Sequence, residues 1–139
     1  LNPVEETTLT IPSTATKVIT VGAYDARFDQ AAAFSGRGYT RATNQVKPDL
    51  VAPGVEIMSC APGGGYQVRT GTSMATPFVT GSAALLMQWG IVNGNDAYLY
   101  GEKMKAYLIR GARKLPGFTV YPNPVLGWGA LCTANSIPR

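Results

Sequence analysis

The chain has 139 residues, the size of one ordinary domain, and 45% of them are hydrophobic, which excludes a disordered tail. Its 16 Gly and 10 Pro follow no repeat, which excludes a coiled coil and a collagen-like chain. Lys and Arg exceed Asp and Glu by 12 to 8, but they are scattered, so we expect no nucleic-acid partner. The charged fraction of 14% is low for a free-standing domain and indicates that part of the surface contacts further protein.

Histidine is absent, so this chain alone cannot complete a mechanism that needs an imidazole base. The two cysteines, Cys60 and Cys132, lack zinc-type spacing and leave either one disulfide or two thiols. No run of about 18 apolar residues predicts a membrane span. The first residues do not resemble a signal peptide, and the missing initiator Met indicates an internal start.

The first half of the chain predicts short strands. Residues 1–16 are expected to be an extended entry segment, and 17–23 (KVITVGA) a strand that is buried on both faces and ends at Gly22. Residues 25–41 predict a loop packed through Phe34. From residue 50, LVAPGVEIMSCAP predicts two strands with a turn at Pro53 and Gly54, and the glycines at 63–65 predict a flexible tip before a strand at 66–69.

The second half predicts helices. Residues 73–91 have apolar side chains all round the helix axis, which indicates a helix buried on nearly every face, and Pro77 places its start near Thr72 or Ser73. Residues 102–110 predict a helix ended by Gly111, with inward-facing residues Met104, Tyr107 and Leu108. A short TVY strand is expected within 115–123, and a final packing segment at 127–137. The alternation predicts an α/β fold with a largely parallel sheet.

One motif places a hydroxyl at a helix start. In RTGTSMATP, residues 69–77, Ser73 follows a Gly-containing turn at the N-terminus of the buried helix. Free N–H groups and the positive end of the helix dipole favour an oxyanion there, as an acyl-transfer nucleophile requires. The alternative is that Thr72 or Ser73 is simply an N-cap, which stabilises a helix by about 1 kcal/mol.

GTSMATP followed by a small-residue helix resembles the active-site serine segment of the subtilisin-like serine peptidases. Three further segments resemble family segments in the same order: VITVGAYD at 18–25, FSGRG at 34–38 and KPDLVAPG at 47–54. GWGALCTANSI near the end extends the resemblance over nearly the whole chain. Residues 1–139 thus resemble the C-terminal part of a subtilisin-like catalytic domain. Their detailed sequence is similar to that of the clostridial germination-type (Csp-like) group.

The resemblance implies that Ser73 is the nucleophile of a Ser-His-Asp triad whose acid and base precede it in the chain. Neither earlier motif is present, because Asp25, Asp29 and Asp49 lie in the wrong contexts and are expected to serve local hydrogen bonding or surface charge. The isolated chain should therefore be inactive. The backbone N–H of Ser73 could supply one oxyanion donor, whereas Asn2 has the wrong neighbours and is left out of the site.

The segment Thr10-Ile11-Pro12 resembles the family segment beside the specificity pocket, which implies a cis Ile11–Pro12 bond and a pocket-lining Thr10. Phe78 stands where the family often has a second, non-triad histidine, so we expect it to pack on the helix.

Two other chemistries receive little support. A Ser-Lys dyad would need a buried lysine, and Lys47, Lys103 and Lys105 are expected in a turn and on a solvated helix face. Calcium is common among subtilases, but Asp25, Asp29 and Asn44 show no EF-hand-like spacing, so no metal or other cofactor is assigned.

The leading hypothesis is therefore a fragment of a serine endopeptidase that hydrolyses peptide bonds once its upstream Asp and His segments are present. The alternative is a non-catalytic, pseudoprotease-type binding or regulatory module. The expected partners are a protein or peptide substrate and the missing N-terminal part of the same peptidase, with self-association through exposed edges. The family resemblance favours an extracellular or spore-associated protein.

Overall fold

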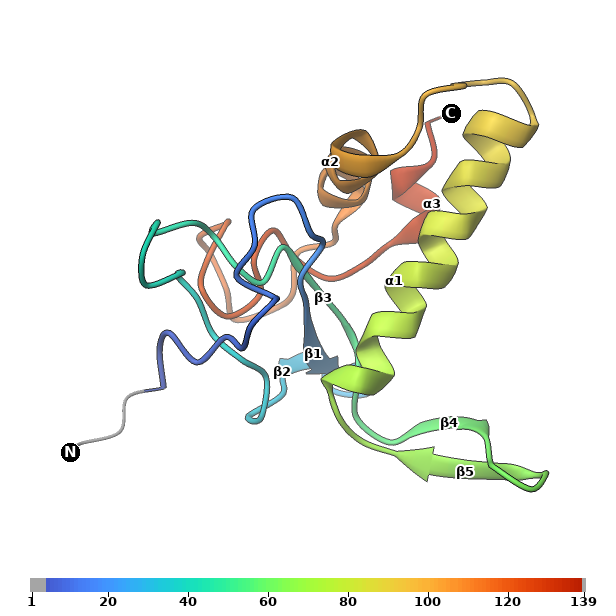
Figure 1. Cartoon of the computed structure of the whole chain (residues 1–139). Coiled ribbons are helices and arrows are strands. Elements are labelled where there is room, and N and C mark those ends of the chain that lie inside the picture. The colour runs from blue at the N-terminus through green and yellow to red at the C-terminus, as the bar shows by residue number, and fades with distance from the viewer. Residues whose placement is uncertain (1–4, 139) are drawn as a thin grey trace.

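A computed structural model describes residues 5–138 and has a small mixed sheet at its centre (Figure 1). The middle strand β1 (Val21–Asp25) pairs in parallel with β3 (Leu50–Pro53) and antiparallel with the two-residue β2 (Gln30–Ala31). Side chains of β3 alternate between two hydrophobic clusters, since successive residues of a strand point to opposite faces. Leu50 and Ala52 face the helices, whereas Val51 faces the loops of residues 115–130. The expected α/β architecture is confirmed.

Strand β1 begins four residues later than the sequence predicts, and Gly22 lies inside it rather than at its end. The glycine is required there, because a Cβ would lie 2.8 Å from the Ser35 hydroxyl and 3.0 Å from a methyl group of Val51. Residues 17–20 remain outside the strand, and Val18 is exposed. Their carbonyl and amide groups bond instead to buried charged side chains, which are described below.

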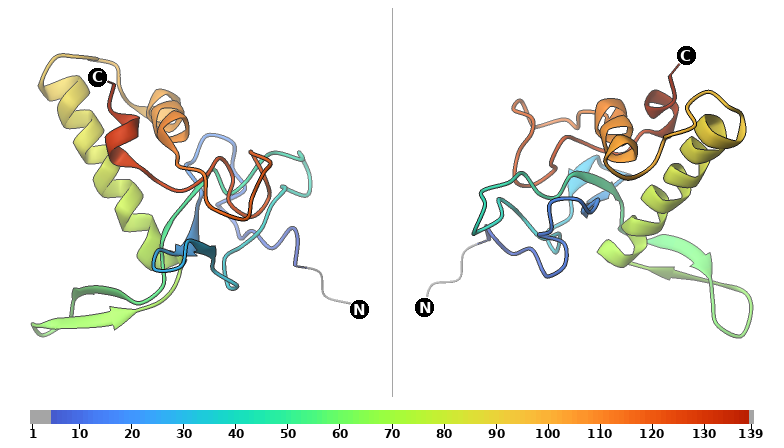
Figure 2. Two further views of the ribbon diagram at one scale, coloured as in Figure 1. Left: turned by 180° about the vertical axis from the view of Figure 1, so that it is seen from behind. Right: turned by 45° about the horizontal axis from the view of Figure 1, so that its top comes forward.

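The hairpin of β4 (Ile57–Cys60) and β5 (Tyr66–Arg69) is confirmed, with the three predicted glycines at its tip. It projects away from the rest of the molecule in all three views (Figures 1 and 2). The register places Met58 opposite Val68 and Cys60 opposite Tyr66, so one face of the hairpin carries exposed, largely apolar side chains. Both cysteines are free thiols.

Helix α1 (Thr72–Met87) starts where Pro77 predicts, but the expectation of burial on nearly every face is wrong. Only a narrow stripe is buried, consisting of Ala75, Val79, Ser82 and Leu86. The reason is that β1, β3, α2 and α3 cover one side of α1, and no described segment covers the other side (Figure 1). The sequence pattern shows which residues are apolar, but only the neighbouring layers decide which of them are buried.

The helix continues through the π-helical turn η1 (Gln88–Val92), so that residues 72–92 are long and apolar enough to cross a membrane by length and composition. Counting uninterrupted apolar residues missed this property. Ala75, Val79 and Leu86 of this segment belong to the hydrophobic cluster around the central sheet, and most of its other residues are not buried.

The C-terminal third follows the predicted order with one difference. Helix α2 (Gly101–Gly111) buries Met104 and Leu108 as expected, and the final segment contains the short α3 (Thr133–Ser136). The TVY segment is not a strand, because Tyr121 packs into the second cluster and its hydroxyl accepts a 2.9 Å hydrogen bond from the Leu115 amide.

Phe34 is 49% exposed and is not the packing residue that the sequence predicts for its loop.

The two adjacent leucines of α1 give a matched test of its orientation. Leu86 is fully buried and Leu85 is 53% exposed. In the 139-residue chain we expect Leu86→Ala to lower the free energy of unfolding by about 2–5 kcal/mol, and Leu85→Ala to change it by less than about 0.5 kcal/mol. Urea unfolding measures both, and equal losses would show that the orientation of α1 is wrong.

Candidate active site

Ser73 is the second residue of α1, directly after the turn that leaves β5. The N-cap residue is Gly71, and no side chain makes a capping hydrogen bond at this helix start. The interpretation of Thr72 or Ser73 as a simple N-cap is therefore wrong. The Ser73 side chain is exposed, while the backbone around it is fixed by the first turn of the helix, where the Met74 amide donates to the Gly71 carbonyl (3.0 Å).

Ser73 opens onto a groove of about 310 Å³ between the start of α1 and strand β4. The groove is lined by Ile57, Met58, Ser59, Ser73, Met74, Pro77 and Phe78. Its walls are mostly apolar, and a carbonyl group bound there would meet both the Ser73 hydroxyl and the first-turn N–H groups. Of those N–H groups, the Met74 amide already donates to the Gly71 carbonyl, whereas the amides of Thr72 and Ser73 precede the first intrahelical bond and are available to an oxyanion.

A second cavity, of about 380 Å³, lies on the other side of the same helix start. Thr72, the neighbour of Ser73, lines it together with Thr10, Ser13, Phe34 and the ion-paired Arg37 and Glu5. Thr10 thus lines a cavity next to Thr72, while its role in a specificity pocket stays a prediction. The Ile11–Pro12 bond is cis as expected. Sequence analysis missed the position of Phe34 on this cavity. The only signal in the sequence was that Phe34, an aromatic residue of the family-like segment FSGRG, belongs to no predicted strand or helix.

The aspartates that precede Ser73 do not reach it, since each is engaged elsewhere. Asp25 binds Arg27, and Asp29 makes a bidentate contact with Arg113 at 2.8 and 3.1 Å. The hydrogen bonds from the arginines lower the pKa of both carboxyls. Among residues 5–138, no three His, Cys, Asp or Glu side chains lie close enough together to hold a metal ion. Asn2 lies outside the described residues.

Asp49 and Lys47 differ from the expectation of a surface turn. Asp49 is only 3% exposed and Lys47 only 1%, and their side chains form a 2.7 Å ion pair. Burial lowers the pKa of the Lys47 amine. The sequence did not reveal this burial, because residues at a Lys-Pro-Asp turn are usually exposed.

A lysine base for Ser73 nevertheless gains no support from the geometry. Lys47 and Lys105 both bind Asp49, and Lys103 binds Asp96 at 2.6 Å. Within the described chain, the residues that line the groove include no lysine.

The ion pair between Asp29 and Arg113 can be tested through the pH dependence of the stability of the chain. The pKa of Asp29 lies below the ordinary 3.8 in the folded chain, so its ion pair stabilises the fold above that value and the stabilisation is lost as the pH falls through the folded pKa. We expect Asp29→Asn to lose less stability than the wild type between neutral pH and pH below 3.8. Urea unfolding at both pH values measures this, with Glu102→Gln on the exposed start of α2 as the control. Identical acid sensitivity in wild type and Asp29→Asn would contradict it.

Comparison with known proteins assigns the family. Residues 2–129 match the model of the subtilase family. The chain is 35% identical to serine protease AprX of Bacillus subtilis over 94% of its length, and 34% identical to the minor extracellular protease Vpr of the same species over 78%. It superimposes on the CspB protease of Clostridium perfringens with a TM-score of 0.93 and 47% identity over 98% of its length.

The chain spans a third or less of these relatives: 32% of AprX, 14% of Vpr and 29% of the CspB chain. Its order of elements and its serine-bearing helix start therefore correspond to one portion of a larger protein fold. On this evidence the chain belongs to the subtilase family and has the subtilisin-like fold, and its similarity to the CspB protease supports the Csp-like group.

Proposed function

We propose that residues 1–139 are the serine-bearing C-terminal part of the catalytic domain of a subtilisin-like serine endopeptidase. The observation that carries the proposal is the exposed Ser73 at an uncapped helix start, facing a groove beside a second, hydroxyl-lined cavity. The family membership supports it. The substrate is a protein or peptide, with neither a nucleic acid nor a membrane as partner.

In the proposed reaction, Ser73 Oγ attacks the carbonyl carbon of the scissile peptide as a base removes its proton. The new C–O bond converts the carbonyl oxygen into an oxyanion, which the Ser73 N–H and the helix dipole stabilise. Collapse of this intermediate breaks the C–N bond and the leaving amine takes the proton. Water then hydrolyses the acyl-serine ester and regenerates the hydroxyl.

The base and the acid of the triad come from the upstream part of the same peptidase, because this chain contains no histidine. Without them the serine hydroxyl is a weak nucleophile, and the rate falls by a factor on the order of 10⁶. No metal or other cofactor takes part in the proposal.

Labelling with a fluorophosphonate probe tests the role of Ser73. We expect the peptidase that contains this chain together with its upstream Asp and His segments to be labelled at Ser73, and Ser73→Ala to abolish labelling. The 139-residue chain by itself should label no faster than denatured protein. Ser59→Ala, which removes another hydroxyl from the same groove, is the control and should leave labelling unchanged. A folded, full-length protein that stays unlabelled would favour the pseudoprotease alternative.

We further propose that the upstream part of the peptidase covers the open side of α1. This side exposes apolar residues along the helix, among them Phe78, Leu85 and Ile91, and the groove beside Ser73 lies at its end. Several exposed large apolar side chains on one helix are typical of an interface. In its absence, pairing of two copies through this face or through the β4–β5 hairpin gives the self-association that we expect.

Leu85 reports on this covering. If upstream residues bury it, Leu85→Ala should cost about 2–5 kcal/mol of unfolding free energy in the full-length peptidase, in contrast to its small effect in the 139-residue chain. Leu86→Ala should be costly in both. Denaturant unfolding of both forms measures the difference, and an equally small cost of Leu85→Ala in both would refute the proposed contact.

We also propose an extracellular or spore-associated location. Support comes from the similarity to an extracellular Bacillus protease and to the CspB protease. Immunodetection of the protein in culture supernatant, spores and cytosol tests the location.

A further inference from the structure

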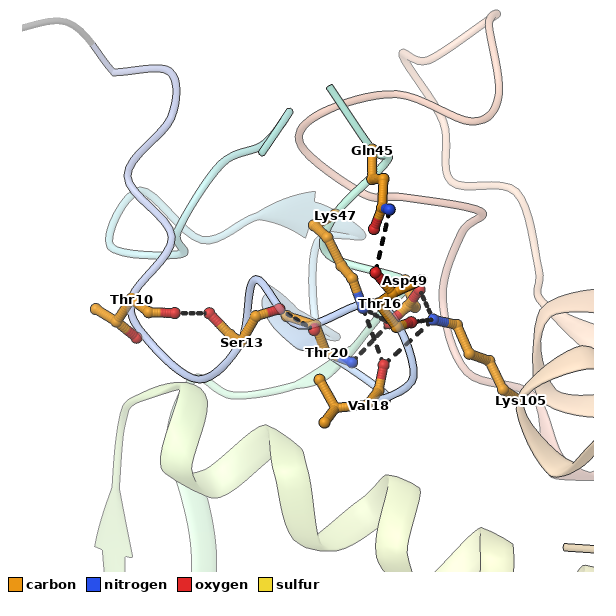
Figure 3. Close-up of polar contacts among 9 residues, drawn as sticks. All are labelled: Thr10, Ser13, Thr16, Val18, Thr20, Gln45, Lys47, Asp49 and Lys105. Carbon is orange, nitrogen blue, oxygen red and sulfur yellow. Dashed lines mark hydrogen bonds and ion pairs between the residues drawn. The ribbon is translucent and has the colours of Figure 1, made fainter. Parts of the chain in front are cut away.

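A charged cluster at the start of β3 consists of the buried Asp49 and Lys47 and the partly buried Lys105 (Figure 3). Asp49 Oδ2 accepts hydrogen bonds from Lys47 Nζ and from the Thr20 amide, both at 2.7 Å, and Asp49 Oδ1 pairs with Lys105 Nζ at 2.6 Å. The cluster therefore joins the turn before β3, helix α2 and the segment that precedes β1.

Both lysines also donate hydrogen bonds to carbonyl groups of the segment that precedes β1. Lys47 Nζ donates to the Val18 carbonyl (2.9 Å), and Lys105 Nζ donates to the carbonyls of Thr16 (3.0 Å) and Val18 (3.2 Å). Charge-assisted bonds of this kind are stronger than neutral ones. Residues 16–20 are thus fixed in place although they belong to no strand or helix.

From Thr20 a hydrogen-bonded path leads to the cavity beside Thr72. The buried Thr20 hydroxyl donates to the Ser13 carbonyl (2.6 Å), and the Ser13 hydroxyl donates to the Thr10 carbonyl (Figure 3). Thr10 and Ser13 both line the cavity. Between residues 5 and 20 the described chain contains no helix or strand, so such contacts decide where this cavity wall lies.

We propose that Asp49, held by Lys47 and Lys105, is a positioning residue for substrate binding, and that it acts through Thr20 and Ser13 on the wall that bears Thr10. The inference rests on the proposed peptidase function, in which this cavity receives a side chain of the peptide substrate. Loss of the path leaves the wall free to move and weakens substrate binding. It does not touch Ser73 or the groove in which the serine lies.

The test avoids Asp49 itself, because removing a buried charge that pairs with two lysines can unfold the protein. Thr20→Val in the full-length peptidase removes only the hydroxyl that bonds Ser13 and leaves the Thr20 amide on Asp49. We expect KM for a short peptide p-nitroanilide to rise about three- to tenfold, the effect of one hydrogen bond, with kcat changed by less than about twofold. Thr20→Ser keeps the hydroxyl and should restore KM.

Thr16→Val is the matched control, since it removes from the same segment a hydroxyl that accepts a 3.1 Å bond from Gln45 and lies off the path to Thr10. Its KM should equal that of the wild type. An unchanged KM in Thr20→Val, or a rise that Thr16→Val reproduces, would overturn the inference. Fluorophosphonate labelling of Ser73 separates the two proposals: an unlabelled wild type refutes the peptidase function, whereas a labelled wild type with an unchanged KM in Thr20→Val refutes only the positioning role.

Discussion

The packing of α1 on the parallel pair β1 and β3 is the constraint on which the rest of the structure depends. Small and branched residues of the helix, Ala75 and Val79, lie against Ala23 and Ala52 of the two strands in one hydrophobic cluster. Close approach is possible because these side chains are small. It fixes the first turn of α1 relative to the sheet, and with it the position of Ser73 and of the free N–H groups beside it.

The polar side of the fold follows from the same sheet. The buried Asp49 lies where a polar turn leads into the apolar strand β3. Its carboxylate binds two lysines and accepts a hydrogen bond from the Thr20 amide. A buried carboxylate without such partners would be strongly unfavourable. The arrangement lets residues without regular secondary structure form one wall of a cavity next to a helix start.

The open face of α1 explains the low charge of the sequence. Residues such as Leu85 and Phe78 remain exposed, whereas a free-standing domain of this size would carry polar residues at those positions. The same face borders the groove in which Ser73 lies. The upstream part that we propose as the cover of α1 would therefore also lie beside the groove of Ser73, and the chain spans only about a third of the relatives that it matches.

Local chemistry in the sequence was sufficient for much of this structure. Glycines and prolines act on their own backbone, so Pro53, Gly54 and the triple glycine predicted the turns, Pro77 predicted the start of α1, and Gly111 the end of α2. The motif around Ser73 predicted its place at a helix N-terminus for the same reason. Only the tertiary structure decided which side of α1 is buried, that Asp49 and Lys47 are internal, and that Phe34 lines a cavity. Burial depends on residues far away in the chain, such as Lys105 of α2 beside Asp49, and no local pattern contains that information.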